Sequence, residues 1–235
     1  MPEIEFSDSE RLAIERAIKG RKSVRAFLDK PVSRETVTRL LEIAARAPSG
    51  TNMQPWRAHV VAGEAKEKMS EAILKAFMTG GMPHPGSEYR YYPEKFFEPY
   101  LSRRRKVGFD MYGLVGIQKG DQAAMAKQLA QNYLFFGAPV GIVFTIDRRL
   151  EIGSWLDYGY FLEALSIAAR ASGLETCSQQ AFAHFPQIMR ETLAISEDDI
   201  VLCGYALGYA DWSAKINALV TERARVSEFA TFQGF

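Results

Sequence analysis

Two short segments concentrate the side chains that could bind a polar ligand. In the first, Arg21–Arg25, three cations and a hydroxyl occur within five residues. Alternation in an extended segment would point Arg21, Ser23 and Arg25 the same way, where charge-assisted hydrogen bonds could hold a phosphate or another anionic group. Taken alone, the segment also fits a solvated basic turn.

The second segment, Ala47–Trp56, lies between an expected helix and an expected strand. It reads Ala-Pro-Ser-Gly-Thr-Asn-Met-Gln-Pro-Trp and is dense in short polar side chains and turn formers. Loops of this composition can present amides and hydroxyls to a planar polar ligand. Taken alone, this loop also fits an ordinary connection.

Motifs that would let the protein itself supply the chemistry are missing. The sequence has no Gly-x-Gly-x-x-Gly, no Walker phosphate loop and no Gly-x-Ser-x-Gly nucleophile elbow. Its three histidines lack metal-ligand spacing, and two cysteines are too few for a disulfide scaffold. We therefore expect no metal site, and an organic cofactor would have to carry any catalysis.

Periodicity and capping signals place these segments among alternating helices and strands. Ser7 and Glu10 form a capping box for a first helix that ends at Gly20. Ser33 caps a second helix, which we expect to end at Ala47. Further helices are expected at 64–78, 121–136, 155–172 and 186–193, and strands at 56–61, 140–146, 175–178 and 200–207. The alternation predicts a mixed sheet packed by helices.

Residues 80 to about 120 resist assignment to helices or strands. They contain several glycines and prolines and many aromatic residues. Loops this long inside a compact domain are usually functional or disordered, and the aromatic content argues against disorder. We expect one domain, residues 1–235, with this inserted excursion lying over a site or an interface. Its candidate substrate contacts are Tyr91, Tyr92, Phe96 and Phe97.

The composition bears on partners and location. The chain has 235 residues and a net charge of +1, so no global field favours nucleic acid or an anionic membrane. The run Arg103–Lys106 is a local exception, either a solvated basic face or a site for an anionic substrate or the phosphates of a reductant. No secretory signal or membrane-spanning stretch is evident, so we expect a cytoplasmic protein.

The two polar segments together resemble the signature of the nitroreductase superfamily. Members carry an Arg-x-Ser-x-Arg-like segment after the first helix and a Pro-Ser-x-x-Asn-x-Gln-Pro-Trp loop before the first strand, and every one of these positions is filled here. Three later stretches, Gly173–Phe182, Leu207–Asp211 and Arg223–Val226, also resemble the family. The long aromatic excursion is most similar to the subgroup of nitrobenzoate and dinitroaniline reductases.

The resemblance implies an α+β nitroreductase-like fold that forms an intertwined homodimer with two FMN sites at its interface. Arg21 and Ser23 would hold the phosphate and ribityl chain. Arg25 would lie near the N1/O2 edge of the ring system, where a positive charge stabilises the reduced flavin. The residues expected to bind FMN are Arg21, Lys22, Ser23, Arg25, Pro48, Ser49, Gly50, Asn52, Gln54, Gln180, Ala181 and Arg223. Those of the Pro48–Asn52 stretch would come from the partner subunit.

The same resemblance implies an activity. Backbone amides near Gln180 and Ala181 would face N5, which accepts and delivers hydride, and NADH or NADPH would reduce nitro-aromatic or related small aromatic compounds by a ping-pong mechanism. Other flavin chemistry on this fold, such as ene reduction or iodotyrosine deiodination, is one alternative. A flavin-binding module without turnover is another. A deiodinase lid pairs a Glu, a Tyr and a Lys around a zwitterion, for which Glu88, Tyr92 and Lys106 are available.

Overall fold

A four-stranded sheet forms the centre of the computed structural model, which describes residues 5–80 and 87–235. The strands are β1 Arg57–Ala62, β2 Val140–Asp147, β3 Glu175–Gln179 and β4 Asp199–Gly208, as the sequence predicts to within a few residues. Their order across the sheet is β1-β2-β4-β3. The strands β1 and β3 are therefore its two opposite edges.

The direction of the strands corrects the expectation of a mixed sheet. All three strand pairs are antiparallel, and within the described residues the parallel pairing is confined to an isolated bridge between Ser23 and Thr176. Alternation of helices and strands does not set strand direction, because several helices rather than one crossover helix separate β1 from β2.

Helices surround the sheet. The α-helices are α1 Asp8–Gly20, α2 Arg34–Ala44, α3 Gly63–Gly80, α4 Tyr100–Leu114, α5 Gln122–Ala130, α6 Ile152–Ala171, α7 Pro186–Leu193 and α8 Val226–Phe229. Short 3-10 helices are η1 Gly50–Asn52, η2 Gln131–Gly137, η3 Gln180–His184 and η4 Lys215–Ala218. The predicted capping box at Ser7 and the predicted N-cap at Ser33 are confirmed.

Two predicted helix ends are wrong. The helix α2 stops at Ala44 rather than Ala47, because the chain tightens before Pro48 into a turn in which the Ala47 amide donates to the Ala44 carbonyl at 2.9 Å. The helix expected to reach residue 136 gives way to η2 after Ala130. Its Phe135 adopts a left-handed backbone, with φ of 51°, and is fully buried.

Inside the aromatic excursion, the helix α4 was not predicted from the sequence. None of its residues is buried, so it lacks the apolar stripe by which a helix is recognised. Glycines at 108 and 113 weaken the local signal further. The excursion therefore contains a regular element, preceded by the irregular segment 87–99.

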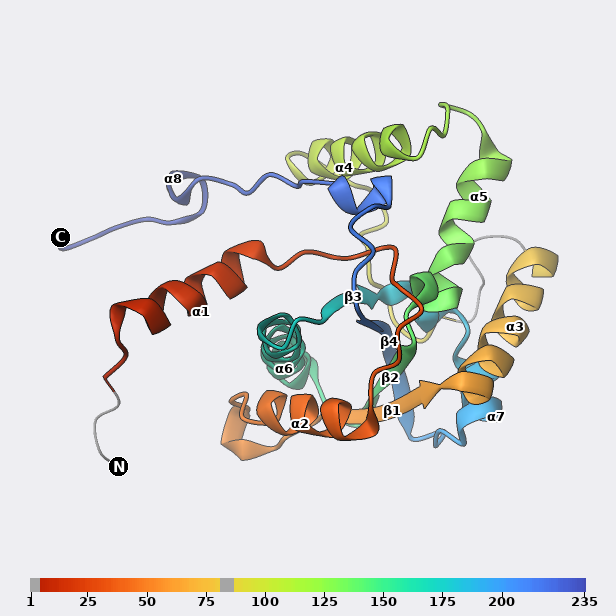
Figure 1. Ribbon diagram of the computed structural model, residues 1–235, viewed down its shortest axis with the longest axis horizontal. Coiled ribbons are helices and arrows are strands. Elements are labelled where there is room, and N and C mark those ends of the chain that lie inside the picture. Colours follow the sequence, from red (N-terminus) through yellow and green to blue (C-terminus); the bar gives the residue numbers. More distant parts are fainter. Residues whose placement is uncertain (1–4, 81–86) are drawn as a thin grey trace.

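Two apolar layers cover the two faces of the sheet. Leu40 of α2 and Leu165 of α6 belong to one layer, and Ile73 of α3 and Met189 of α7 belong to the other. Figure 1 shows α2 and α6 on one side of the strands and α3 and α7 on the other. The sheet is thus buried between two apolar layers, with β1 and β3 at its edges.

The helix α1 and the C-terminal tail project from this body on the same side (Figure 1). The apolar stripe predicted for α1 is present but largely uncovered by the described residues: Leu12, Ile14 and Ile18 are 58%, 43% and 49% exposed. In the tail, Phe229 and Phe232 are exposed as well.

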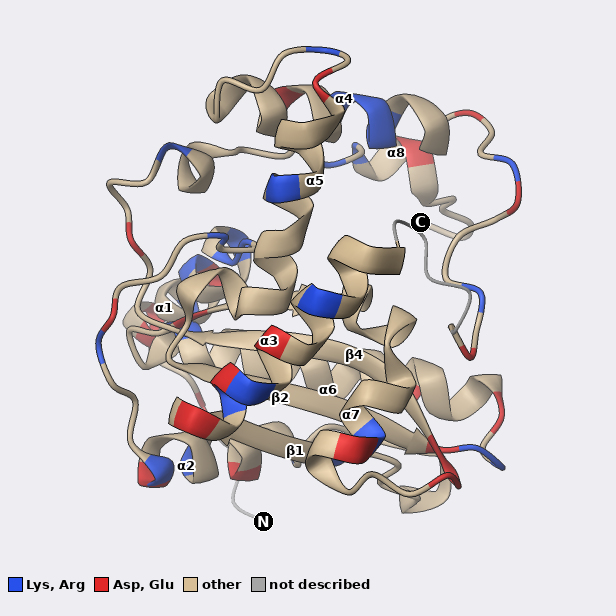
Figure 2. Cartoon of the chain, turned by 90° about the vertical axis from the view of Figure 1, so that its right-hand side faces the viewer, with Lys and Arg blue, Asp and Glu red and all other residues tan. Residues whose placement is uncertain are grey.

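Figure 2 shows the charged residues mainly on the outer helices, the loops and the ends of strands, while the strands themselves are largely uncharged. Among the helices of the described residues, none combines the length and the apolar character needed to cross a membrane.

Candidate active site

The basic segment after α1 runs beside the β3 edge of the sheet. The Val24 amide donates to the Thr176 carbonyl at 3.0 Å, and the Phe27 amide donates to the Phe136 carbonyl at 3.2 Å. The chain leaves α1 in an extended conformation at Arg21, where φ is −61° and ψ is 134°. The motif residues 21–25 are therefore presented next to β3, as an added strand would be.

Asn217, which no sequence signal singled out, fixes this segment from the C-terminal side. It is 3% exposed. Its Oδ1 accepts from the Arg25 amide at 2.8 Å, and its Nδ2 donates to the carbonyls of Ala26 and Asp211 at 2.8 and 2.7 Å. Its carbonyl accepts from Lys22 Nζ at 2.6 Å. One buried residue thus holds the backbone of the motif through its side-chain amide and a cation of the motif through its main-chain carbonyl.

A basic cavity of about 540 Å³ opens beside the motif. Four cations line it against one carboxylate, that of Glu163, which lies 3.2 Å from Arg21 Nε. These cations are Lys19, Arg21, Lys22 and Arg223. The excess of positive charge suits a phosphate, which accepts charge-assisted hydrogen bonds.

An aromatic pocket of about 620 Å³ lies between the 87–99 segment and the chain that follows β3. Its lining includes Tyr89, Tyr91 and Tyr92 from that segment and Ser178–Ala181 from the end of β3 and the start of η3. Predicted substrate and flavin residues therefore meet in one pocket. The other two predicted contacts do not line it: Phe96 and Phe97 pack instead on neighbouring rings of the excursion.

Gln179, which the sequence did not single out, carries an unpartnered polar atom in this pocket. The residue is 2% exposed, and its Nε2 donates to the Asn132 carbonyl at 2.6 Å. Its buried Oε1 has no hydrogen-bond donor among the described residues. An unsatisfied buried acceptor costs about 1–3 kcal/mol, so the atom is suited to a donor on a bound ligand. A flavin carries such a donor, its imide N–H, so the residues present fit FMN.

The hydroxyl groups around the aromatic pocket are held in their neutral form. Burial raises the pKa of Tyr133 to about 12, and it raises the pKa of Tyr89 and Tyr91 from their ordinary value. All three phenols therefore remain protonated near neutral pH, and the tyrosines add no negative charge to the pocket.

The second polar loop lies elsewhere. It leads into β1, the edge opposite β3, and the Gly50 amide donates to Asp157 Oδ2 of α6 at 3.1 Å. Thr51, Asn52 and Gln54 all have positive φ, of 49°, 60° and 49°. Such backbone costs roughly 1–2 kcal/mol per residue. The loop is thus held in a strained shape, a feature that often marks a ligand site.

The 87–99 segment is anchored to the sheet by two adjacent side chains, those of Glu88 and Tyr89. Glu88 accepts from Arg190 Nη2 at 3.0 and 3.1 Å and also pairs with Arg148. The next residue, Tyr89, donates its hydroxyl hydrogen to the Leu202 carbonyl. These contacts hold the start of the segment against β4 and its neighbours.

The arrangement expected of a deiodinase lid is not formed. Glu88 is occupied by two arginines, as described above, and does not line the aromatic pocket. Lys106 pairs with Asp110 at 2.7 Å and lines a different cavity, next to the C-terminal tail. Of the three residues available for that role, Tyr92 alone lines the aromatic pocket.

Comparison with known proteins gives consistent matches over nearly the whole chain. The Nitroreductase family model matches residues 18–209. A 4-nitrobenzoate reductase of Pseudomonas putida is 41% identical over 93% of this chain and 94% of its own length, and a nitrobenzene nitroreductase of Ectopseudomonas oleovorans is 37% identical over 93% and 96%. The crystal structure of an FMN-dependent nitroreductase from Mycobacterium smegmatis in complex with NADPH matches with a TM-score of 0.89, at 30% identity, covering 95% of this chain and 99% of that one.

Proposed function

This chain belongs to the nitroreductase family, and from that premise we propose that it is an FMN-dependent enzyme that uses NADH or NADPH to reduce nitroarenes as a homodimer. The observation that carries the proposal is the aromatic pocket of about 620 Å³, which Gln180 and Ala181 line together with Tyr91 and Tyr92. A flat cofactor and a flat substrate can stack there, since aromatic rings favour offset stacking.

Each part of the site has a role that its surroundings support. FMN, when bound, supplies the two-electron transfer from the nicotinamide to the nitro group. Arg21, Lys22 and Arg223 bind its phosphate by charge in the basic cavity. Arg25 places a cation beside its ring system, and Gln179 offers an unpartnered acceptor. The phenols of the pocket stay neutral and exclude water from the stacked rings.

In our proposal the two polar segments act on one cofactor only when a second copy of the chain is present. Residues 21–25 run beside β3, whereas residues 48–54 lead into β1, at the opposite edge of the sheet. The two remaining strands lie between these edges, and strands are spaced about 4.8 Å apart. In our proposal the Pro48–Gln54 loop therefore completes the site of the partner subunit.

Exposed apolar surface supports the same conclusion. The stripe of α1 and the rings of the tail have no cover within the described residues. Exposed apolar side chains of this kind on a folded chain favour association, because association removes them from water. We place the enzyme in the cytoplasm, since Cys177 and Cys203 are free buried thiols that suit a reducing compartment.

The activity is tested on the purified yellow protein without oxygen. We expect NADPH or NADH to bleach the flavin absorbance and 4-nitrobenzoate or nitrobenzene to restore it. A protein that binds FMN but is not bleached by either nucleotide would be a flavin-binding module. Bleaching without re-oxidation by any nitroarene, but with iodide release from iodotyrosine, would identify a deiodinase instead.

The shared site is tested by complementation between subunits. Arg21→Ala and Asn52→Asp should each weaken FMN binding in their own homodimers. Asn52→Asp is chosen because Asp keeps the side-chain shape and tolerates the positive φ. If the two segments serve one site across the interface, a co-expressed mixed dimer holds one site with both changes and one with neither. It should regain about one FMN per dimer; a mixed dimer as weak as its parents would overturn the shared site.

A further inference from the structure

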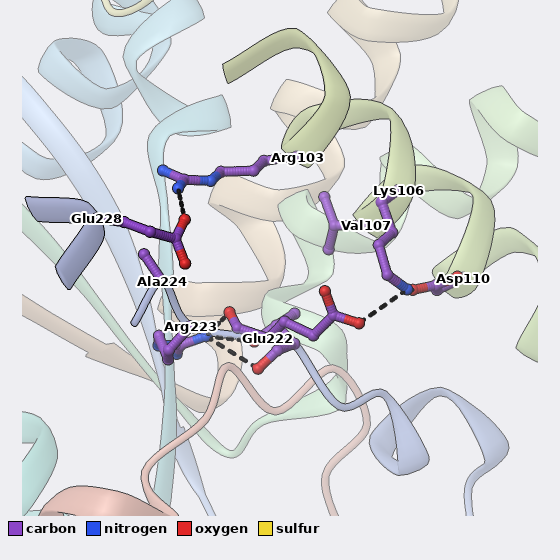
Figure 3. A pocket seen from close by; sticks show the side chains of 9 residues that line it. Arg103, Lys106, Val107, Asp110, Glu222, Arg223, Ala224 and Glu228 are labelled. Carbon is purple, nitrogen blue, oxygen red and sulfur yellow. Dashed lines mark hydrogen bonds and ion pairs between the residues drawn. The ribbon is translucent and has the colours of Figure 1, made fainter. Parts of the chain in front are cut away.

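The run of four cations on α4 is divided between two sides of the helix. Arg103 lies 3.7 Å from Glu228, and Lys106 lies 2.7 Å from Asp110 and 3.7 Å from Glu222. Figure 3 shows these side chains gathered around the cavity between α4 and the C-terminal segment. Carboxylates match the charges of these two cations. The cavity between α4 and the C-terminal segment therefore has no excess positive charge with which to bind an anion.

Arg104 lies on another side of the helix, about 100° around its axis from Arg103. Its guanidinium carbon is 4.5 Å from the ring centroid of Phe96 and 5.9 Å from that of Tyr92. It lines the aromatic pocket, and within residues 5–80 and 87–235 it has no ion pair or hydrogen bond. The five N–H donors of this side chain therefore remain available.

The lining of the aromatic pocket has an uncompensated positive charge. It includes two arginines and no aspartate or glutamate. Arg90, the other arginine, pairs with Glu94 at 2.8 Å, so the surplus belongs to Arg104. Aromatic stacking keeps the guanidinium near the pocket without using its hydrogen-bond donors.

We propose that Arg104 binds an anionic substituent, a carboxylate, on the nitroarene in the aromatic pocket, and that the enzyme therefore favours carboxylated nitroarenes over neutral ones. The inference rests on the proposed function and names the substrate class of that site. A guanidinium matches a carboxylate with two parallel hydrogen bonds, and the ring of a benzoate packs on the neighbouring tyrosines. Because Arg104 is exposed, salt should weaken the attraction.

The test compares 4-nitrobenzoate with its neutral analogue 4-nitrobenzamide on the FMN-loaded enzyme. Arg104→Gln removes the charge at similar length, and Arg104→Lys keeps it. The matched control is Arg105→Gln, which changes the neighbouring arginine; both arginines line a second groove of α4, but Arg105 does not line the aromatic pocket. We would measure FMN content, the rate of flavin reduction by NADPH, and kcat/KM for both nitroarenes. The kcat/KM values are measured at low and at high ionic strength.

We expect Arg104→Gln to lower kcat/KM for 4-nitrobenzoate roughly 10-fold or more, the effect of one charge-assisted contact. The value for 4-nitrobenzamide should change less than about 2-fold, and Arg104→Lys should retain part of the preference. Equal losses of kcat/KM for both compounds would overturn the inference. A loss confined to flavin reduction by NADPH would overturn it too, because it would assign Arg104 to the phosphates of the reductant. If the unaltered enzyme reduces neither compound, the proposed function fails instead.

Discussion

The segment that we assign to the cofactor and the segment that we assign to the substrate are attached to the same sheet by different forces. Residues 21–27 are tied to their neighbours by main-chain hydrogen bonds and by the buried amide of Asn217. Residues 87–99 are tied mainly through the carboxylate of Glu88, together with the Tyr89 hydroxyl on the Leu202 carbonyl, and beyond Tyr89 they rest mainly on contacts between exposed rings. Amide hydrogen bonds are indifferent to salt and mild acid, whereas ion pairs respond to both.

This difference separates two tasks within one site. A cofactor that stays bound through many turnovers needs a fixed binding segment, whereas a segment that lines a substrate pocket must admit and release molecules of varied shape. Substitutions that remove one attachment at a time should therefore change one segment without changing the other.

The largest effect is expected from Glu88→Ala. Arg190 is 6% exposed, and removing one partner of a buried ion pair typically costs about 3–5 kcal/mol. Glu197 and the Asp199 carbonyl remain near Arg190, so we expect the lower end of that range, a fall in Tm of roughly 5–10 °C. KM for the nitroarene should rise, while the FMN dissociation constant should change less than about 2-fold.

The matched control is Glu94→Ala, which breaks an exposed pair with Arg90 in the same segment. Exposed pairs contribute about 0–1 kcal/mol, so Tm should barely move. If Glu88→Ala loses FMN as readily as it loses substrate affinity, the two segments form one structural unit and the contrast between them fails.

An intermediate effect is expected within the cofactor segment. Arg21→Ala should weaken FMN binding more than it slows flavin reduction, because Arg21 lines the basic cavity. Arg25→Ala should do the reverse, because in our proposal its guanidinium, which donates to the Ser23 carbonyl at 3.3 Å, lies beside the ring system of FMN. Losing one charge-assisted contact costs roughly 1.5–3 kcal/mol, or one to two decades.

The measurements are FMN affinity by fluorescence and the pre-steady-state rate of flavin reduction by NAD(P)H. Lys68→Ala, a change to an exposed lysine paired with Glu64 on α3, is the control for loss of a positive charge. Equal effects of Arg21→Ala and Arg25→Ala on both quantities would contradict the division of roles.

A similar contrast separates the elements that the sequence alone predicts from those that it does not. The strands and most helices were predictable because their apolar periodicity is strong, and the cofactor segments were recognisable because their ligand restricts residue type. The helix α4 was not, since it buries nothing and shows no stripe. Asn217 and Gln179 were missed because their importance depends on partners far away in the chain, at Arg25 and Asn132.

The end of η2 is a second feature that the sequence does not predict. Phe135 and Phe136 adopt left-handed conformations that aromatic residues rarely take, and tertiary packing of Phe135 on Phe182, with centroids 4.6 Å apart, overrides the helical preference. No local pattern could have predicted that turn. The prediction of strand direction was wrong for a similar reason, because the direction depends on how several helices return the chain to the sheet.

The smallest effect is expected from acid and from Asp147→Asn, at the turn that carries Arg148. Hydrogen bonds from Arg149 hold the pKa of Asp147 well below its usual value near 3.9. A carboxylate whose pKa is lowered by folding stabilises the protein fully above its unfolded pKa and loses that contribution as pH falls toward the folded one. The variant should therefore be less stable than the parent at pH 7, and the gap should shrink below about pH 4.

Thermal unfolding from pH 7 to pH 3.5 measures that gap, and amide hydrogen exchange shows where it acts. Because Arg148 also pairs with Glu88, loosening this turn should speed exchange in residues 87–99 before it affects residues 21–27. The exposed carboxylate of Glu94, changed to Gln, serves as the control and should leave both segments unaltered. If exchange speeds up equally in both segments, the turn supports the whole sheet. Residues 87–99 would then have no separate acid-sensitive attachment.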